Sequence, residues 1–204
     1  MQLAILRDNL WSRGHAAEVP SDRIEVAGRV PRGLRLLPNF VPQARQDEIT
    51  AWIAAHVSWS CSGYCGNRRE TFMPGHNPLP EWGEALGRRM VEAGFFEAVP
   101  DHLHLIEYNA GGGFPFHKDC DEIGAVISGL TLGSSRVIEF RREDGPATIR
   151  ALLRPGDLYV MSGEARRDWQ HSIPFTEADQ FRGQVYPRTN GISVTWRLMP
   201  HGPQ

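Results

Sequence analysis

The pattern of apolar and polar residues changes character about halfway along the chain. In the first half apolar residues recur at helical spacing, whereas in the second half they fall into short runs typical of strands. The first helical segment covers residues 43–57, where one face carries Ile49, Trp52, Ile53 and then His56 or Val57. We therefore predict a helix here that packs against the outside of a sheet.

A second helix is expected from the run that starts at Pro78. Its beginning carries prolines and a glutamate, which favour the first turn of a helix. Trp82, Leu86 and Met90 then follow as an apolar stripe. The stripe ends at about Gly94, so two helices precede the β-rich half of the chain.

From about residue 103 onward, helical periodicity gives way to short β-rich segments. These are 103–108, 114–118, 125–132, 136–142, 147–153, 157–162, 169–173 and 191–198. Turn residues separate them at 111–113, 133–134, 144–146 and 155–156. Short strands that follow helices predict an α+β, mainly β fold: a double-sheet jelly roll (double-stranded β-helix) with the N-terminal helices packed on one sheet.

A chain of 204 residues is expected to form one domain. Residues 1–25 show no clean period and are expected to be an extension of unknown role. Residues 26–100 supply the helices, preceded by a short apolar segment at 35–42 that ends in proline. Residues 101–200 are expected to form the jelly-roll catalytic core.

The composition is that of an ordinary globular protein, with 41% apolar residues, 23% charged residues and a formal net charge of −2. A chain without net positive charge can hold nucleic acid only through a local basic patch. The apolar runs are too short to span a bilayer, and the first residues lack the basic start and long apolar core of a signal peptide. Three cysteines are too few for a disulfide framework or a closed zinc site. These features predict reduced thiols, a cytoplasmic protein and no membrane partner.

The stretch 101–121 offers metal ligands. His117 and Asp119 stand two residues apart, and side chains at i and i+2 of an extended segment point to the same face. A third ligand is available in His171, 54 residues later. Two neutral imidazoles and one carboxylate with open coordination positions are typical of non-haem Fe(II) oxygenases. The same three residues could hold zinc or manganese, and a His-x-Asp spacing alone also arises by chance at an exposed strand end.

The segments around these ligands follow a particular order along the chain. They are Tyr108-Asn109-Ala110-Gly111-Gly112-Gly113, His117-Lys118-Asp119, Leu130-Thr131-Leu132-Gly133-Ser134, Val137-Ile138-Glu139-Phe140, Arg154-Pro155-Gly156-Asp157-Leu158-Tyr159-Val160-Met161-Ser162-Gly163, His171-Ser172-Ile173-Pro174 and Ser193-Val194-Thr195-Trp196-Arg197. In order and spacing they resemble the AlkB-like family of Fe(II)/2-oxoglutarate-dependent dioxygenases. The resemblance covers about residues 36–199.

The resemblance implies an enzyme in which His117, Asp119 and His171 are the catalytic residues that hold Fe(II), with 2-oxoglutarate as co-substrate. It also implies that Arg197 binds a carboxylate of 2-oxoglutarate, which a guanidinium can grip with two parallel hydrogen bonds. Tyr108 matches the family's tyrosine that donates its hydroxyl to the same molecule. The expected reaction is oxidative demethylation or hydroxylation of an alkylated base in DNA or RNA, as in DNA repair. No protein partner is implied.

The chain departs from the family pattern at two positions. The family's Arg-x-Ser-x-Thr-x-Arg strand has Gly191 here in place of its first arginine, and the family's asparagine two residues before the tyrosine is Ile106. A buried carboxylate without its cation is costly, so another group must compensate if 2-oxoglutarate binds. Arg188, Arg136 and Arg150 are the candidates for that cation. The alternatives are weak binding of the co-substrate and loss of activity.

Substrate contacts are suggested by the same resemblance. Asp121 matches a family position that contacts the exocyclic amine of a methylated base, although an exposed acid at a turn is the plain alternative. Arg167 matches a family arginine at the edge of the site, whereas its neighbour Arg166 is expected in solvent. Residues 59–75 are expected to form a lid over the substrate, with a solvated loop as the alternative. Side chains there that could stack on a substrate ring or pair with a phosphate are Trp59, Tyr64, Arg68 and Arg69.

Two rival functions stay open at the level of sequence. One is a dioxygenase that hydroxylates a small molecule or a protein side chain, which the lack of net positive charge favours. The other is a non-catalytic, metal-binding jelly roll, which Gly191 and Ile106 favour. The presence of all three ligands, His117, Asp119 and His171, argues against this second rival.

Overall fold

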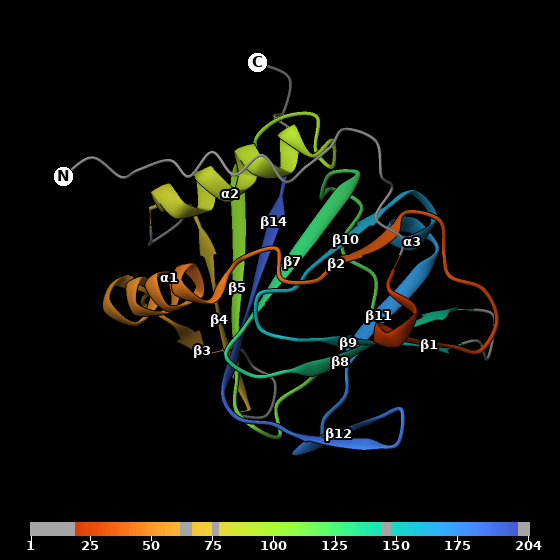
Figure 1. The fold of residues 1–204 in the computed structure, drawn as a ribbon. Coiled ribbons are helices and arrows are strands. Elements are labelled where there is room, and N and C mark those ends of the chain that lie inside the picture. Colours follow the sequence, from red (N-terminus) through yellow and green to blue (C-terminus); the bar gives the residue numbers. More distant parts are fainter. Residues whose placement is uncertain (1–18, 62–66, 75–77, 144–147, 200–204) are drawn as a thin grey trace.

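The computed structural model describes residues 19–61, 67–74, 78–143 and 148–199. Figure 1 shows two β-sheets arranged as layers, with helices α1 and α2 against the outer face of one of them. Every strand pairing in the described residues is antiparallel. The predicted mainly β jelly roll, with the N-terminal helices on one sheet, is confirmed.

The larger sheet has seven strands within the described residues. Their order is β2 (Leu34–Leu37), β10 (Leu158–Ser162), β7 (Val126–Leu132), β14 (Gly191–Arg197), β5 (His102–Tyr108), β4 (Arg68–Met73) and β3 (Ser60–Cys61). The smaller sheet has the order β1 (Ile24–Val26), β9 (Thr148–Leu153), β8 (Arg136–Arg142), β11 (Trp169–Ile173) and β6 (Phe114–His117). A separate hairpin pairs β12 (Ala178–Phe181) with β13 (Gln184–Pro187).

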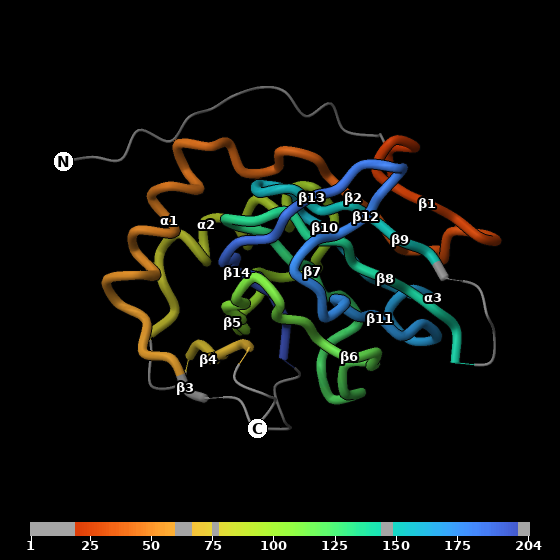
Figure 2. Tube along the Cα trace, turned by 90° about the horizontal axis from the view of Figure 1, so that it is seen from below, coloured from red at the N-terminus to blue at the C-terminus, as the bar shows by residue number. Residues whose placement is uncertain are grey.

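The helices form because each has an apolar face to bury. In α1 (Gln43–His56) this face carries Ile49 and Ile53, and in α2 (Glu81–Glu92) it carries Trp82, Leu86 and Met90. These side chains pack with apolar residues of the larger sheet in one buried cluster. Seen from below, α1 lies on one side of the molecule and the smaller sheet on the other (Figure 2). No helix in the described ranges is both long and apolar enough to cross a bilayer.

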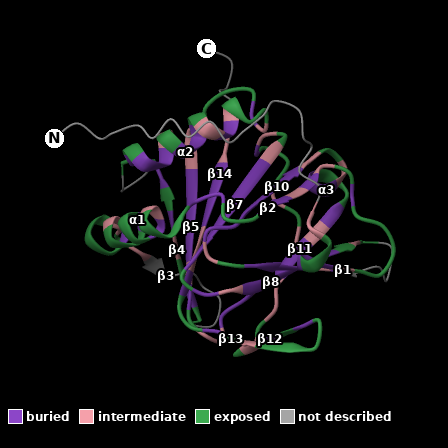
Figure 3. Ribbon diagram, viewed as in Figure 1, coloured by how far each residue is buried: buried purple, intermediate pink, exposed green. Residues whose placement is uncertain are grey.

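A second buried cluster fills the space between the sheets. It joins residues of the smaller sheet, such as Ile138 and Phe140, to residues of the larger sheet, such as Ile127 and Met161. Figure 3 shows buried residues along the central strands of both sheets, with exposed residues on the helices and connections. The inner faces of the two sheets therefore supply both the core and, as described below, the walls of a cavity.

Several of the described segments differ from the expectations. Ile24–Val26, which spans the expected end of the N-terminal extension at residue 25, forms strand β1 on β9. Arg68–Met73, placed in a lid or loop, forms strand β4 on β5, with Arg68 opposite Tyr108 and Met73 opposite Leu103. Both segments are strands because each pairs with a neighbouring strand, and local composition does not reveal such pairing. The short helices η1 (Ser21–Arg23) and α3 (Gly163–Arg167) were also not expected.

Candidate metal centre and adjoining cavity

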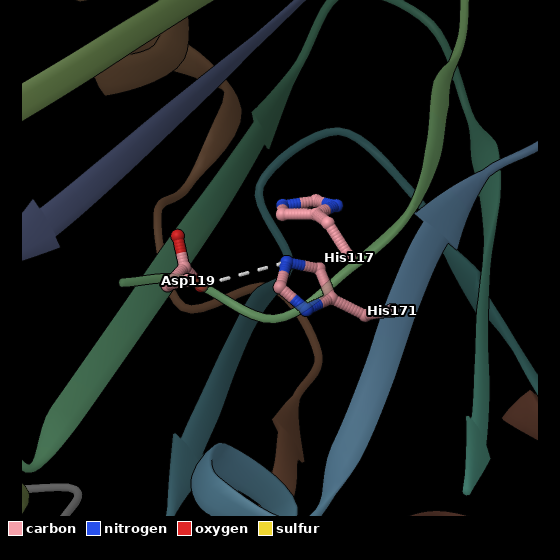
Figure 4. Close-up of side chains that lie close together, drawn as sticks. All are labelled: His117, Asp119 and His171. Atoms are coloured by element: carbon pink, nitrogen blue, oxygen red, sulfur yellow. Dashed lines mark ion pairs between the residues drawn. The ribbon is translucent and has the colours of Figure 1, made fainter. Parts of the chain in front are cut away.

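Two histidines far apart in the sequence are neighbours across a pair of strands. His117 ends β6, and the antiparallel register of β6 and β11 places it directly opposite His171. The two ring centroids are 4.2 Å apart, with planes inclined at 48°. Figure 4 shows both rings and Asp119 turned toward one another. The 54-residue separation is therefore bridged by a single cross-strand pair.

Asp119 completes the cluster from the turn that follows β6. One potential ligand atom from each of the three residues lies within 4.8 Å of the other two. Oδ2 of Asp119 is 3.7 Å from Nε2 of His171, and it is buried without a hydrogen-bond partner among the described residues. Its other oxygen, Oδ1, accepts a hydrogen bond from Nη2 of Arg197 at 3.1 Å. A buried carboxylate oxygen without a partner is costly, and a bound cation would remove that cost.

The protonation states suit a metal. His117 Nδ1 donates to the carbonyl of Pro115 at 2.9 Å, which leaves Nε2 as the ring nitrogen that faces the cluster. Burial lowers the pKa of His171 to about 3, so its imidazole is neutral at neutral pH. Burial would raise the pKa of Asp119, but nearby His171 and Arg197 outweigh it and hold that pKa below its usual value. Two neutral imidazoles and a carboxylate are the donor set that Fe(II) oxygenases use.

Arg166 holds the turn that carries Asp119. Its guanidinium donates to the backbone carbonyls of Asp119 at 3.2 Å, Cys120 at 2.6 Å and Ile123 at 3.2 Å. The side chain is buried, so the expectation that it lies in solvent is wrong. Its neighbour Arg167 is the exposed member of the pair. The difference follows from α3, whose backbone turns Arg166 toward the core and Arg167 away from it.

A cavity of about 200 Å³ adjoins the three residues, between the two sheets. Both predicted co-substrate residues, Tyr108 and Arg197, lie in its wall. Burial raises the pKa of Tyr108, which keeps its phenol protonated and able to donate a hydrogen bond. Ile106 also lines the cavity, at the position where the family pattern has an asparagine.

Sequence reasoning missed several cavity residues, among them His104, Thr131, Ile138 and Tyr159. His104 stands four residues before Tyr108 on β5, so alternation along a strand places both on the same face. That alternation is the signal that could have found it. Tyr159 stands within the segment 154–163 that carries the family resemblance, but its place in the wall depends on β10 lying beside β7.

A hydrogen-bonded chain leads away from the cluster through the larger sheet. Nη2 of Arg197 lies 3.0 Å from Nδ1 of His104, and Nε2 of His104 lies 3.0 Å from Oε2 of Glu70. Because the arginine can only donate, Nδ1 of His104 accepts and Nε2 donates to Glu70. Burial lowers the pKa of His104, consistent with this neutral tautomer. Nη2 of Arg197 is therefore held by His104 as well as by Asp119.

The predicted substrate residues that the structure describes lie outside the cavity wall. Asp121 and Arg167 are exposed and form an ion pair with each other at 3.2 Å. The ring of Trp59 lies under the guanidinium of Arg69, which also pairs with Glu107. Tyr64 falls outside the described residues. The substrate roles of these residues stay predictions.

Arg68 has a different position from the other predicted substrate residues. It is buried, and its guanidinium covers the ring of Phe114 at 3.8 Å. Nη1 donates to the carbonyl of Gly113 at 3.2 Å. Phe114 lies in the cavity wall, so Arg68 supports that wall from behind. A substrate contact by Arg68 itself stays a prediction.

Comparison with known proteins gives three consistent findings. The model of the 2OG-Fe(II) oxygenase superfamily matches residues 57–197. The chain is 32% identical to "Alpha-ketoglutarate-dependent dioxygenase alkB homolog 7, mitochondrial" of Bos taurus, over 98% of this chain and 90% of that protein. It is also 32% identical to "tRNA (carboxymethyluridine(34)-5-O)-methyltransferase ALKBH8" of Mus musculus, over 52% of this chain but only 17% of that protein's length.

The fold has a solved counterpart. The structure described as "The structure of OsALKBH1" matches with a TM-score of 0.66 and 16% identity, over 83% of this chain and all of that one. At this identity the match supports the architecture of the sheets and helices and nothing more specific.

Proposed function

The chain belongs to the AlkB-like members of the 2OG-Fe(II) oxygenase superfamily, and we propose that it oxidises an alkyl group on a nucleobase of DNA or RNA. The enzyme class is that of a 2-oxoglutarate-dependent dioxygenase with Fe(II) as its metal. The proposal depends above all on the cluster of His117, Asp119 and His171, whose buried carboxylate oxygen lacks a partner beside a cavity.

In this proposal the three clustered side chains hold Fe(II). His117 donates Nδ1–H to Pro115, which leaves Nε2 as its metal-binding nitrogen. His171 is kept neutral by burial, so it has no proton to lose when it binds metal. The Asp119 carboxylate has one oxygen engaged by Arg197 and the other free. Three protein ligands leave coordination positions open for a co-substrate.

Tyr108 and Arg197 are the proposed residues for 2-oxoglutarate. Both lie in the wall of the cavity that contains the three ligands. Arg197 keeps its Nε buried and without a hydrogen-bond partner among the described residues, so one strong donor is available to a carboxylate. The protonated phenol of Tyr108 offers a second donor.

Fe(II) with 2-oxoglutarate and O₂ would insert one oxygen atom into a substrate C–H bond, with conversion of 2-oxoglutarate to succinate and CO₂. The protein's own residues bind, orient and exclude water. Ile106, Ile127 and Ile138 give the cavity an apolar wall, which strengthens the electrostatic contacts made inside it. When the oxidised carbon is an N-methyl group, the N-hydroxymethyl product breaks down to formaldehyde and the demethylated base.

The nucleobase proposal is supported by strand β6. Phe114 and Phe116 are half-buried on the strand that ends in His117. Arg68 covers the ring of Phe114, and Arg141 lies 4.1 Å from the ring centroid of Phe116. Aromatic rings and guanidinium planes are the surfaces on which extruded bases stack. The name of the ALKBH8 relative also refers to tRNA.

A second candidate is the hydroxylation of a small molecule or a protein side chain. It is favoured by the charge balance around the site, where cations are matched by acids. Arg167 pairs with Asp121 at 3.2 Å, and Lys118 pairs with Glu143 at 3.0 Å. Paired cations attract phosphates weakly, because the neighbouring carboxylates cancel their field.

The test uses two oligonucleotides of one sequence, with and without an N-methylated base. Each is incubated with the protein, Fe(II), 2-oxoglutarate and O₂, and formaldehyde and the mass of the oligonucleotide are measured. We expect formaldehyde and loss of the methyl group from the methylated strand alone, and neither with Asp119→Ala. Binding of the oligonucleotide should also weaken steeply as salt rises.

The second candidate makes the opposite predictions. Succinate would form from 2-oxoglutarate without any change in the methylated oligonucleotide, and no salt-dependent binding of nucleic acid would be seen. Methylated DNA and methylated RNA are assayed separately, because a negative result with one does not exclude the other as a substrate.

A further inference from the structure

Gly191 leaves a space that another arginine occupies. It begins β14, at the position where the family strand carries its first arginine. A Cβ atom placed on Gly191 would lie 3.3 Å from Nε of Arg136 and 3.1 Å from the carbonyl oxygen of Leu132. Arg136 begins β8 in the opposite sheet. The guanidinium of Arg136 therefore lies beside the position from which the side chain of the family's arginine would extend, although it comes from another strand.

The contacts of Arg136 fix its guanidinium in the cavity wall. The residue is only 4% exposed. Nη2 donates to the carbonyl of Thr189 at 2.9 Å and to that of Asn109 at 3.2 Å. The guanidinium lies 5.0 Å from the centroid of the Tyr108 ring. Its Nε is buried and has no hydrogen-bond partner among the described residues.

Arg136 is also a buried cation that lacks an anion. Among the residues that the structure describes, no carboxylate forms an ion pair with it. Burial, and then the nearby charge of Arg188, lower the pKa of Arg136 to about 10. Asp179, the acid close to both, is already engaged by Arg188. An anionic ligand group in the cavity would supply the missing negative charge.

The other two candidate cations are excluded by their surroundings. Arg188 has Nε and Nη2 each 2.6 Å from a carboxylate oxygen of Asp179, and it does not line the cavity. Arg150 lies on β9 and pairs with Glu25 at 2.6 Å and Glu139 at 3.1 Å. Both are therefore neutralised by acids, whereas Arg136 is not.

We infer that Arg136, together with the hydroxyl of Tyr108, binds the distal carboxylate of 2-oxoglutarate in place of the arginine absent at Gly191. The inference rests on the proposed function, because it assigns the far end of the co-substrate in the same cavity. The 2-oxo acid end is then left to Arg197 and to the Fe(II) that His117, Asp119 and His171 would hold. The loss of an arginine on β14 is compensated from β8, across the gap between the sheets.

The experiment measures binding rather than turnover. The protein is loaded with Fe(II) without oxygen, and 2-oxoglutarate is titrated while the charge-transfer absorption of the chelate is recorded. For Arg136→Met we expect the affinity to fall by about 100-fold, the size of effect expected when one partner of a buried charge pair is truncated. Arg150→Met, the matched control on the neighbouring strand, should bind as the wild type does.

A ligand without the distal carboxylate separates this role from a general loss of the site. 2-Oxobutyrate carries the same 2-oxo acid end, so its affinity should change by no more than a few-fold between wild type and Arg136→Met. The double variant Arg136→Ala/Gly191→Arg returns the guanidinium to the family position and should recover most of the affinity for 2-oxoglutarate. If Arg136→Met fails to fold, as judged by circular dichroism, the double variant tests the role of Arg136 instead. A folded double variant without recovered affinity for 2-oxoglutarate would then overturn that role.

The outcomes distinguish a failure of the proposed co-substrate site from a failure of the role assigned to Arg136. A wild-type protein that shows no absorption band at any concentration of 2-oxoglutarate would overturn the proposed co-substrate site, and the role of Arg136 with it. A wild-type band combined with an undiminished affinity in folded Arg136→Met would overturn the role of Arg136 alone. An equal loss of affinity for 2-oxoglutarate and 2-oxobutyrate would do the same.

Discussion

Nη2 of Arg197 donates to Oδ1 of Asp119 at 3.1 Å, so the arginine expected to bind the co-substrate also holds a metal ligand. Both side chains are largely buried, with 11% and 7% of their surfaces exposed. The contact directs the second oxygen, Oδ2, toward the two imidazoles. Arg197 is therefore placed to act on the metal and on 2-oxoglutarate alike.

Replacing Arg197 with methionine should weaken metal binding even in the absence of 2-oxoglutarate. The expected loss is about tenfold, the lower end of the range for residues that orient a metal ligand. Mn(II) affinity, measured from the electron paramagnetic resonance signal of the free ion, provides the test. The exposed Arg167→Met is the control. An unchanged Mn(II) affinity in Arg197→Met would show that the arginine serves only the co-substrate.

Asp119→Ala should remove metal binding, with an affinity loss of more than about 100-fold, because even residues that merely orient ligands cost about 10- to 100-fold. Asp121→Ala is the matched control, since that carboxylate is two residues away and 94% exposed. The melting temperature with and without excess Mn(II) reports the difference, because a ligand that binds only the folded state raises it. Equal stabilisation of both variants would refute the assignment of Asp119.

The chain from Glu70 through His104 to Arg197 should stabilise the fold as well as the site. His104→Phe removes both hydrogen bonds and leaves polar groups of Glu70 and Arg197 with fewer partners, while Phe72 can still stack on the new ring. The expected loss is about 1–3 kcal/mol in the free energy of unfolding. Urea unfolding of the metal-free protein measures it. His102→Phe, at a more exposed histidine of the same strand, is the control and should lower the free energy of unfolding by less.

The sequence was sufficient wherever one local pattern determined the structure. The β-rich segments from residue 103 onward and both helices lie where their apolar periods place them, with ends that differ by a few residues. The spacing of His117 and Asp119 likewise predicted their convergence, because it depends on two neighbouring positions alone. His171 was one available third ligand, and only the resemblance singled it out, since its place opposite His117 depends on strand register.

Features that depend on distant pairing could not be predicted in this way. Strand β4 has a polar sequence that resembles a loop, and its ladders with β5 and β3 make it a strand. Arg166 and Arg167 are chemically identical neighbours, yet the orientation of α3 buries one and exposes the other. The position of Arg136 opposite Gly191 likewise depends on how the two sheets face each other, which no local pattern records.

The last prediction concerns acid stability and Glu164 in α3, just before the strand that carries His171. Its carboxylate accepts hydrogen bonds from Arg29 at 2.9 Å, from the backbone of Arg32 at 3.3 Å and from the indole of Trp169 at 3.3 Å. The bond from Arg29 is the main reason that the pKa of Glu164 falls from 4.5 to about 2.

A carboxyl group with a lowered pKa in the folded state binds fewer protons there than in the unfolded state. Its contribution to stability is therefore complete above pH 4.5 and is lost as the pH falls from 4.5 toward 2. Glu164→Gln should lower stability at neutral pH and flatten the decline in this window, so that the two proteins converge near pH 2. Thermal unfolding of the metal-free proteins across this pH range measures both effects. Parallel decline of the two melting temperatures down to pH 2 would mean that Glu164 titrates normally in the folded protein.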